Sequence, residues 1–482
     1  MGFQVSPGVN VTEIDLTTIV PAVSTTAAGI AGVFQWGPVG ERTLVDSVNT
    51  LKERFQGPDN DTFEYFFTAA NFLGYGNNLQ VVRVVDETTA LNAADDGTGE
   101  LIKNETDFDT KTGANLTGNF FAKYPGTLGN ALGVHVFDGV NNGTVGVTIG
   151  TSSGGATLGT TVGVGSSSIS ISLGAAASGI TAQVGDILRL PTGQNVTIKN
   201  AIDGATVANI TPVISQQIIA GDAGGVTLES RYAAIFGTSD PTTADVESAG
   251  GTNDLINVAV VDETGLWTGT PKTVLETFEG LSKASDAKKF TGENNFFKDV
   301  INNTSEYIWV ENDSLVTTNT KANRTFGNIT PNTKLTSALG AEFTLSGGTA
   351  TASLDETFLY SNGYSLFEDA ETVDVSLILG GPASATVQSL LVDLCETRKD
   401  CMAFFSPRPS SDFVNKEEAT ATSNAVTFVN ETLNRSSSYA VMDSGYKYMF
   451  DTFNGVFRYV PLNGDVAGLL ARTERENEAW FS

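Results

Sequence analysis

Histidine and cysteine are scarce in this 482-residue chain, which contains one histidine and two cysteines. The pair Cys395 and Cys401 is too small for the disulfide framework of an extracellular scaffold. Together with one histidine it cannot supply a four-ligand zinc site of the usual spacing. We therefore expect a protein without a bound metal that is made and folded in a reducing cytoplasm.

Long apolar runs and clustered cations are also missing. No apolar run approaches the roughly 20 residues needed to cross a bilayer, and the N-terminus lacks the cationic start and apolar core of a secretory signal. Lysine and arginine total 27 against 55 acidic residues, for a formal net charge of −28. Because a nucleic-acid backbone is bound by clustered cations, we predict no nucleic-acid partner and no membrane insertion. The acidic surface favours solubility at high concentration before assembly.

Two short strings imitate catalytic motifs without the context that catalysis requires. Residues 150–154 match the G-x-S-x-G nucleophile elbow, but the only histidine, His135, lies upstream and no helix pattern follows. Ser444 and Lys447 match S-x-x-K, yet their flanking residues indicate a turn and a hairpin rather than a helix start. Neither a phosphate-binding glycine loop nor a calcium loop occurs. We therefore predict no catalytic residues, no cofactor and no metal site.

Alternating strand and helix patterns at the two ends of the chain predict one open α/β sheet. In the N-terminal part we expect strands at 29–36 and 79–85, with helices at about 47–55 and 62–73. In the C-terminal part we expect strands at 373–379, 401–405 and 439–442, helices at 383–397 and 416–433, a hairpin at 446–460 and a helix at 465–476. The spacing of Val466, Leu469 and Leu470 predicts that they pack inward from this last helix. We expect a discontinuous α/β core domain made of residues 21–88 and 354–482.

The composition of the chain changes between these two halves. Residues 140–230 are rich in Gly, Ser, Thr and Val, and alternating runs such as 186–190 and 195–198 predict a β-rich insertion, a small sandwich or barrel. A disordered linker is the alternative for part of it. Residues 89–139 and 231–353 predict a mixed α/β insertion domain, with strands at 258–261 and 307–310 and helices near 273–281 and 294–300.

The first 20 residues form an extended segment ahead of the core. Side chains from Val9 to Ile14 alternate loosely, as in a strand with one face covered. Such an isolated strand must find partners for its backbone groups at the edge of a sheet. We therefore predict an N-terminal linking arm, residues 1–20, that joins a neighbouring copy; packing onto its own subunit is the alternative. The residues expected to form the linkage are Phe3, Val5, Pro7, Gly8, Val9, Val11 and Ile14.

Several short strings resemble, in the same order along nearly the whole chain, the tail sheath proteins of contractile bacteriophages. In the first part of the chain they are SPG at 6–8, GVFQWGP at 32–38, LGYGNN at 73–78 with VVR at 81–83, and YPGTLGN at 124–130. Further on they are SEYI at 305–308, DCM at 400–402, YKY at 446–448, DVAGL at 465–469 and ART at 471–473. No single string is diagnostic, but their shared order is specific.

This resemblance implies a structural subunit of a contractile tail sheath. Subunits of that family stack as six-membered rings around a tail tube, and a baseplate trigger starts a contraction that drives the tube through the host envelope. The resemblance implies a homo-oligomer whose partners are the tail tube protein, the baseplate and the tail terminator, located in the virion after assembly in the host cytoplasm. Neighbouring subunits would be linked by β-augmentation, in which arms add strands to a sheet in another subunit.

Two alternatives and one departure accompany this interpretation. A related contractile injection system, a secretion system or a bacteriocin, would use a similar sheath, and the β-rich insertion alone would suit an adhesin or glycan-binding surface protein. Members of the family continue past the AWFS string at 479–482 into a further domain that faces the tube and accepts the arms, whereas this sequence ends at Ser482. We therefore expect residues 1–482 alone to remain monomeric.

Overall fold

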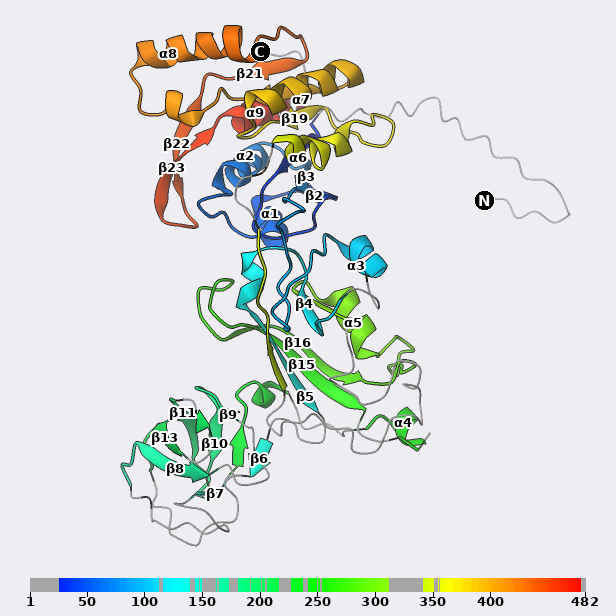
Figure 1. The fold of residues 1–482 in the computed structure, drawn as a ribbon, viewed down its shortest axis with the longest axis vertical. Helices are drawn as coiled ribbons and strands as arrows, with labels where there is room; N and C mark the ends of the chain where they lie inside the picture. Colours follow the sequence, from blue (N-terminus) through cyan, green and yellow to red (C-terminus); the bar gives the residue numbers. More distant parts are fainter. Residues whose placement is uncertain are drawn as a thin grey trace, which may run out of the picture.

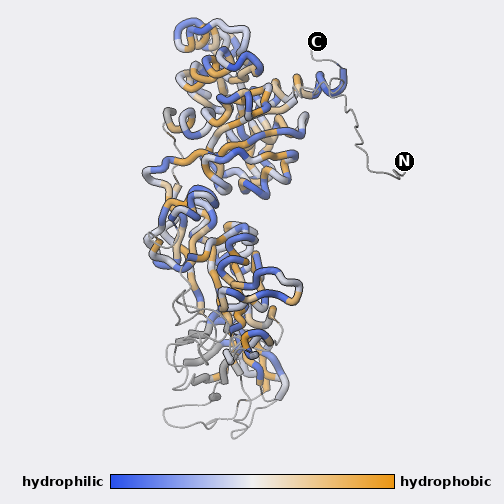
Figure 2. The backbone as a smooth tube through the Cα atoms, turned by 90° about the vertical axis from the view of Figure 1, so that its right-hand side faces the viewer, coloured by the Kyte–Doolittle hydropathy of each residue, from blue (hydrophilic) through white to orange (hydrophobic). Residues whose placement is uncertain are grey.

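Three bodies follow one another along the long axis of the molecule (Figures 1 and 2). The computed structural model describes residues 26–111, 116–138, 144–146, 148–149, 162, 164–172, 181–190, 192–200, 202–203, 206–215, 227–236, 242–248, 250–251, 254–311, 341–350, 354 and 356–477. The predicted linking arm, with Phe3, Val5, Pro7, Gly8, Val9, Val11 and Ile14, lies outside these residues.

The first body, at the top of Figure 1, contains a six-stranded sheet in the order β2-β3-β1-β19-β20-β21. Its strands are β1 (Ala28–Gly32), β2 (Arg42–Val45), β3 (Leu79–Arg83), β19 (Leu377–Leu379), β20 (Met402–Phe405) and β21 (Ala440–Met442). All neighbours are parallel except β2 and β3. Because Ala28 pairs with both Leu79 and Leu377, strands from distant parts of the chain meet at the centre of one sheet.

Helices cover both faces of this sheet, as expected for buried parallel strands. On one face an apolar cluster joins the sheet to α1 (Val48–Phe55), α2 (Phe63–Leu73) and α9 (Asn463–Glu476). On the other face a second cluster includes α6 (Glu356–Ser361), the 3-10 turn Tyr364–Phe367 and α7 (Ala385–Arg398). Helix α8 (Glu418–Thr427) continues into a π-helical turn, Phe428–Leu433. The helices and strands predicted for this part are therefore present, although β1 and β19 are shorter than predicted.

Helix α9 shows that the prediction for its leucines was wrong. Leu469 and Leu470 are exposed, and the buried positions are Asn463, Gly464, Ala467, Gly468 and Ala471. The small residues form a stripe that lies close against α2 and the turn after it: a Cβ on Gly464 would come within 2.2 Å of the Thr68 carbonyl oxygen, and one on Gly468 within 2.7 Å of the Tyr75 ring. The close approach of α2 and the turn after it therefore requires the glycine face of α9 to be buried, and the two leucines are exposed.

The second body is built on a four-stranded antiparallel sheet in the order β16-β15-β5-β18. These strands are β5 (Leu132–Asp138), β15 (Leu255–Asp262), β16 (Thr273–Ser282) and β18 (Ala341–Thr344). Around them lie α3 (Glu105–Lys111), α4 (Ala244–Ser248), α5 (Phe297–Thr304) and the paired strands β4 (Phe120–Ala122) and β17 (Ile308–Val310). The helix predicted at 273–281 is wrong, because this segment is β16 and pairs with β15 along its length. Tertiary pairing overrode the local pattern.

Two segments that connect the first and second bodies are paired with each other. Leu91 and Thr349 donate backbone N–H groups to each other's carbonyl oxygens at 2.9 Å in both directions, and Ala94 and Ser346 do the same at 2.8 and 2.9 Å. The two connecting segments are thus held together by backbone hydrogen bonds.

The third body lies at the other end of the molecule and carries a seven-stranded antiparallel sheet in the order β6-β14-β10-β11-β13-β8-β7. The strands are β6 (Thr144–Gly146), β7 (Thr148–Ile149), β8 (Ser168–Ser172), β10 (Ile187–Arg189), β11 (Asn195–Ile198), β13 (Thr206–Thr211) and β14 (Thr227–Glu229). A separate pair consists of β9 (Thr181–Ala182) and β12 (Ile202–Asp203). The strands predicted at 186–190 and 195–198 correspond to β10 and β11; a sandwich or barrel stays a prediction.

Candidate assembly surface

A two-stranded hairpin projects from the first body (Figure 1). Its strands, β22 (Tyr446–Asp451) and β23 (Val456–Pro461), pair antiparallel with Tyr448 opposite Tyr459 and Phe450 opposite Phe457. Side chains of one strand alternate between the two faces, so these four aromatic rings share one face and the residues between them share the other. The hairpin matches the prediction for 446–460.

The back face of the hairpin is fixed to the first body by polar and aromatic contacts. Arg458 stacks over the ring of Phe63 at 4.5 Å and donates from Nε to Asp451 Oδ2 at 2.7 Å. Lys447 Nζ donates to Asp465 Oδ1 of α9 at 2.7 Å. At the turn, Phe453 packs edge-on against Phe66 at 5.3 Å between ring centroids. These contacts hold the hairpin on α2 and α9, and on the opposite face Tyr459 donates to Asn415 Oδ1 at 2.9 Å.

The front face, which we call the aromatic face, consists of Tyr448, Phe450, Phe457 and Tyr459. Tyr448, Phe457 and Phe450 are 60%, 59% and 46% exposed. Within this face the ring centroids of Tyr448 and Phe457 lie 5.0 Å apart, those of Tyr448 and Tyr459 4.7 Å, and those of Phe450 and Phe457 5.0 Å. Clustered exposed aromatic side chains mark surfaces that bind other molecules.

A buried arginine joins the first body to the second. Arg83 ends β3 and is fully buried. Its guanidinium donates to the carbonyl oxygens of Phe34, Gln35 and Gly37 in the first body and of Pro125 in the second, at 2.8, 3.2, 2.9 and 2.6 Å. Burial lowers the pKa of Arg83 to about 9. Five donors in a planar fork suit this set of acceptors, which a lysine could not match.

An aromatic side chain crosses the same junction. Trp36 follows β1 but belongs to the apolar cluster of the second body, among residues of β5, β15 and α5. Its ring lies edge-on to those of Tyr124 and Trp267, with centroids 5.3 and 4.8 Å away. Arg83 and Trp36 therefore make the junction a packed interface rather than a loose linker.

The carboxyl edge of the parallel strands, where α/β proteins often bind ligands, is closed by its own polar network. Asn463 Nδ2 donates to Ser406 Oγ at 2.9 Å and to the Gly381 carbonyl oxygen at 3.0 Å. Ser406 Oγ donates to Asp443 Oδ2 at 2.6 Å, and Gln388 Nε2 donates to the Ser406 carbonyl oxygen at 2.8 Å. Apart from Gln388 Oε1, which is buried without a partner, these polar atoms bond to one another, as in a structural network.

Asp443 in this network predicts a measurable pH dependence. Burial, with the nearby Asp465 adding to it, raises the pKa of Asp443 from 3.8 to about 6. The folded state therefore binds this proton more tightly than the unfolded chain, so ionised Asp443 lowers stability near neutral pH and the loss disappears as the pH falls from about 6 toward 4. We expect Asp443→Asn to unfold with a free energy up to ~3 kcal/mol higher at about pH 7.5, about 1 kcal/mol higher at about pH 4.5 and nearly equal at about pH 3.5, measured in urea. A difference that does not vary with pH would contradict this assignment.

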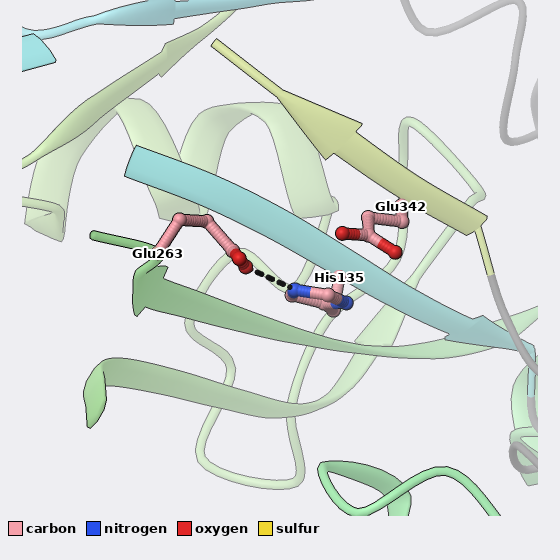
Figure 3. Close-up of side chains that lie close together, drawn as sticks. All are labelled: His135, Glu263 and Glu342. Carbon is pink, nitrogen blue, oxygen red and sulfur yellow. Dashed lines mark hydrogen bonds and ion pairs between the residues drawn. The ribbon is translucent and has the colours of Figure 1, made fainter. Parts of the chain in front are cut away.

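The fold brings the single histidine beside two glutamates, an arrangement that sequence spacing did not reveal. His135 on β5 lies with its Nε2 3.0 Å from Glu263 Oε1, and Glu342 on β18 faces the same ring (Figure 3). Each of the three side chains offers one atom that could bind a metal ion, and these three atoms lie within 4.8 Å of one another. Glu263 also pairs with Lys272. The residues come from positions 135, 263 and 342, so only the sheet register could have identified them.

Among the described residues, the sequence strings considered for catalysis or metal binding are not part of a comparable cluster of side chains. The string at 150–154 lies outside them. Lys447 of the S-x-x-K string pairs with Asp465, as noted above, and Tyr446 begins β22 of the hairpin. Cys395 and Cys401 are buried with their sulfur atoms 3.4 Å apart and are not bonded as a disulfide. None of the described helices has the length and hydrophobicity needed to cross a bilayer.

The exposed aromatic face is a candidate surface for binding other molecules. Comparisons with known proteins show which proteins this chain is similar to. No family model matches the chain. It is 27% identical over 489 residues to the tail sheath protein of Salmonella phage ViI, covering 98% of this chain and 70% of that protein. It is also 27% identical to the tail sheath proteins of Vibrio phage KVP40 and Enterobacteria phage T4, each time over 99% of this chain and over 75% and 74% of theirs.

Two solved structures of sheath tail proteins are also similar to this chain. The one from Desulfitobacterium hafniense has a TM-score of 0.40 at 8% identity, covering 97% of this chain and 62% of that one. The one from Listeria innocua has a TM-score of 0.38 at 9% identity, covering 92% of this chain and 56% of that one. This chain thus spans less than two thirds of either structure. The resemblance to phage tail sheath proteins is confirmed by the three curated relatives alone.

Proposed function

We propose that this protein is a structural subunit of a contractile phage tail sheath. It polymerises as stacked six-membered rings around the tail tube and contracts to drive the tube through the host envelope. The observation that carries this proposal is the similarity to three phage tail sheath proteins over 98–99% of the chain. Since the chain corresponds to 70–75% of the length of those proteins, rings, contraction and partners are proposals for this chain.

The proposed partners follow from the same role. They are further copies of this chain, the tail tube protein, the baseplate and the tail terminator, in a virion tail assembled in the host cytoplasm. Residues 21–88 and 354–482 form the core domain in this proposal. Residues 89–139, 231–353 and 140–230 form the insertion domains, which project from it. The shared sheet of β1, β3, β19, β20 and β21 supports this division.

The aromatic face is proposed as a contact with a second copy of this chain. Two copies, each with a net charge of −28, repel each other over most of their surfaces. An attractive contact must therefore come from uncharged apolar surface, and this face contains no Asp, Glu, Lys or Arg. Aromatic side chains present about 150–250 Å² each, so the three exposed rings, each about half exposed, supply roughly 250–400 Å² per copy. That is the centre of a standard interface of about 800 Å² per partner, not the whole of it.

Electron microscopy tests the proposed role directly. The natural protein, expressed from its whole gene and negatively stained, should form tubes or stacked rings. A population that remains monomeric at concentrations of tens of micromolar would contradict the sheath proposal and favour a surface-binding protein.

Deletion of residues 1–16 tests the linking arm. We expect the deletion protein to unfold cooperatively, because the α/β sheet begins at Ala28, and to fail to form tubes, because β-augmentation between copies is lost. Normal tubes from a protein that still folds would rule out the arm as the link. Loss of folding would indicate instead that the arm packs onto its own subunit.

A further inference from the structure

Sheet register places His135 and Glu342 side by side. His135 on β5 pairs with Glu342 on β18 and with Ala259 on β15. Directly paired residues project to the same face of a sheet, so the imidazole and the carboxylate meet above it (Figure 3). This is the face opposite to Leu132, Val134 and Val136, which pack into the main cluster of the second body.

Glu263 completes the group from the end of β15. Its backbone N–H donates to the Ala131 carbonyl oxygen at 2.7 Å, which fixes the residue beside the start of β5. Its carboxylate then occupies space above Gly133, where a Cβ would lie 2.6 Å from Glu263 Oε1. A glycine two residues before His135 thus leaves the room in which this carboxylate reaches the imidazole.

Glu263 has Lys272 as its ion-pair partner, whereas the described contacts give no hydrogen bond or ion pair to Glu342, whose side chain is exposed. Lys272 interacts electrostatically with Glu342 as well, and both Lys272 and Arg231 act on His135. Two carboxylates held within 4.8 Å of each other repel, and these cations and the surrounding water offset part of that repulsion. A divalent cation would neutralise both carboxylates at once.

The three side chains offer one imidazole nitrogen and two carboxylate oxygens as ligand atoms. An imidazole with two carboxylates suits a transition metal such as Zn²⁺ better than Mg²⁺ or Ca²⁺, which prefer oxygen ligands only.

We propose that His135, Glu263 and Glu342 bind one divalent transition-metal ion, represented by Zn²⁺, on the four-stranded sheet of the second body. The ion ties together β5, β18 and the segment after β15. Because β18 returns to this sheet from a distant part of the sequence, the ion fixes the edge of the sheet. Lys272 competes with the metal for Glu263, so the ion-paired and metal-bound arrangements exclude each other.

Metal titration of the full chain tests the proposal. Zn²⁺ and, as a spectroscopic probe, Co²⁺ are added in the presence of excess Mg²⁺, which occupies weak sites on the acidic surface. We expect one saturable site per chain, with a visible Co²⁺ absorption band that Zn²⁺ abolishes. His135→Gln and Glu342→Gln should each weaken binding by more than about tenfold. Glu293→Gln, an exposed glutamate of the same body outside the group, is the matched control and should bind as the unaltered protein does.

A further variant separates a metal site from a purely structural ion-pair network. Lys272→Gln removes the competing cation, so it should bind Zn²⁺ more tightly, by about fivefold for a partly exposed ion pair. The same variant should be less stable than the unaltered protein when metal is absent and should regain stability when Zn²⁺ is added. No saturable uptake by the unaltered protein, or equal uptake by His135→Gln, overturns the proposal. Weaker Zn²⁺ binding by Lys272→Gln also overturns it, because lysine would then support the site rather than compete for it.

Discussion

Replacement of Arg83 by methionine should lower the free energy of unfolding by about 4 kcal/mol, the largest loss we expect from a single substitution in this chain. The methionine fills much of the same volume but leaves the carbonyl oxygens of Phe34, Gln35, Gly37 and Pro125 without their donor. Each unsatisfied buried carbonyl costs roughly 1–3 kcal/mol, and the costs are partly relieved by local relaxation. Urea unfolding followed by tryptophan fluorescence measures the loss, since Trp36 lies at the same junction.

Two further variants make this result specific. Arg83→Lys keeps the charge but has a single nitrogen, so it should recover less than half of the lost stability. Arg54→Met removes another contact between the two bodies, the exposed pair of Arg54 and Glu306 at 3.9 Å, and should cost no more than about 0.5 kcal/mol. Equal losses from Arg83→Met and Arg54→Met would show that the buried hydrogen bonds contribute no more than a surface ion pair.

Local patterns in the sequence were enough to predict most elements of the first body. The apolar run at 79–85 became β3, and Ser47, at the start of the predicted helix, caps α1 by accepting from the Thr50 N–H at 3.1 Å. Each of these signals is contained within a few consecutive residues.

Features that depend on distant partners could not be predicted in this way. The segment 273–282 carries a helix-compatible pattern, but it pairs with β15 from Thr273 to Ser282 in a ladder with two register shifts. Helix α9 offered a leucine face and a glycine face, and only the close approach to Thr68 and Tyr75 decides between them. The group of His135, Glu263 and Glu342 exists because β5 lies between β15 and β18, an order that no local pattern contains.

The role of Arg83 shows the same limit inside a recognised string. The VVR string lies inside the strand predicted at 79–85, and an arginine is ordinarily expected at the surface. The structure buries it because the loop at 34–37 and Pro125 present carbonyl oxygens toward one point. Those acceptors come from segments far from Arg83 in the sequence, so the hydrogen-bond set could be found only in the folded molecule.

The double substitution Tyr448→Ser and Phe457→Ser should abolish assembly while leaving the subunit folded. Both rings lie on the exposed side of the hairpin, whereas Arg458, Lys447 and Phe453 hold the hairpin to the first body. We therefore expect the midpoint of urea unfolding to change little. If the aromatic face is the centre of an interface between copies, each ring contributes about 2 kcal/mol to association, so the concentration needed for tubes should rise by roughly a thousandfold.

The matched control for this experiment is Leu44→Ser with Val426→Ser, two exposed apolar residues on β2 and α8 that lie outside the aromatic face. This control also replaces two exposed apolar side chains by serine. It should leave the critical concentration for tube formation within a factor of about three of the unaltered protein's value. Sedimentation of the assembled fraction over a concentration series, with electron microscopy of the pellets, measures both proteins in a preparation where the unaltered protein forms tubes. Normal tubes from the hairpin variant would show that the aromatic face is not a contact between copies, and the attraction needed to overcome two charges of −28 would then have to come from another surface.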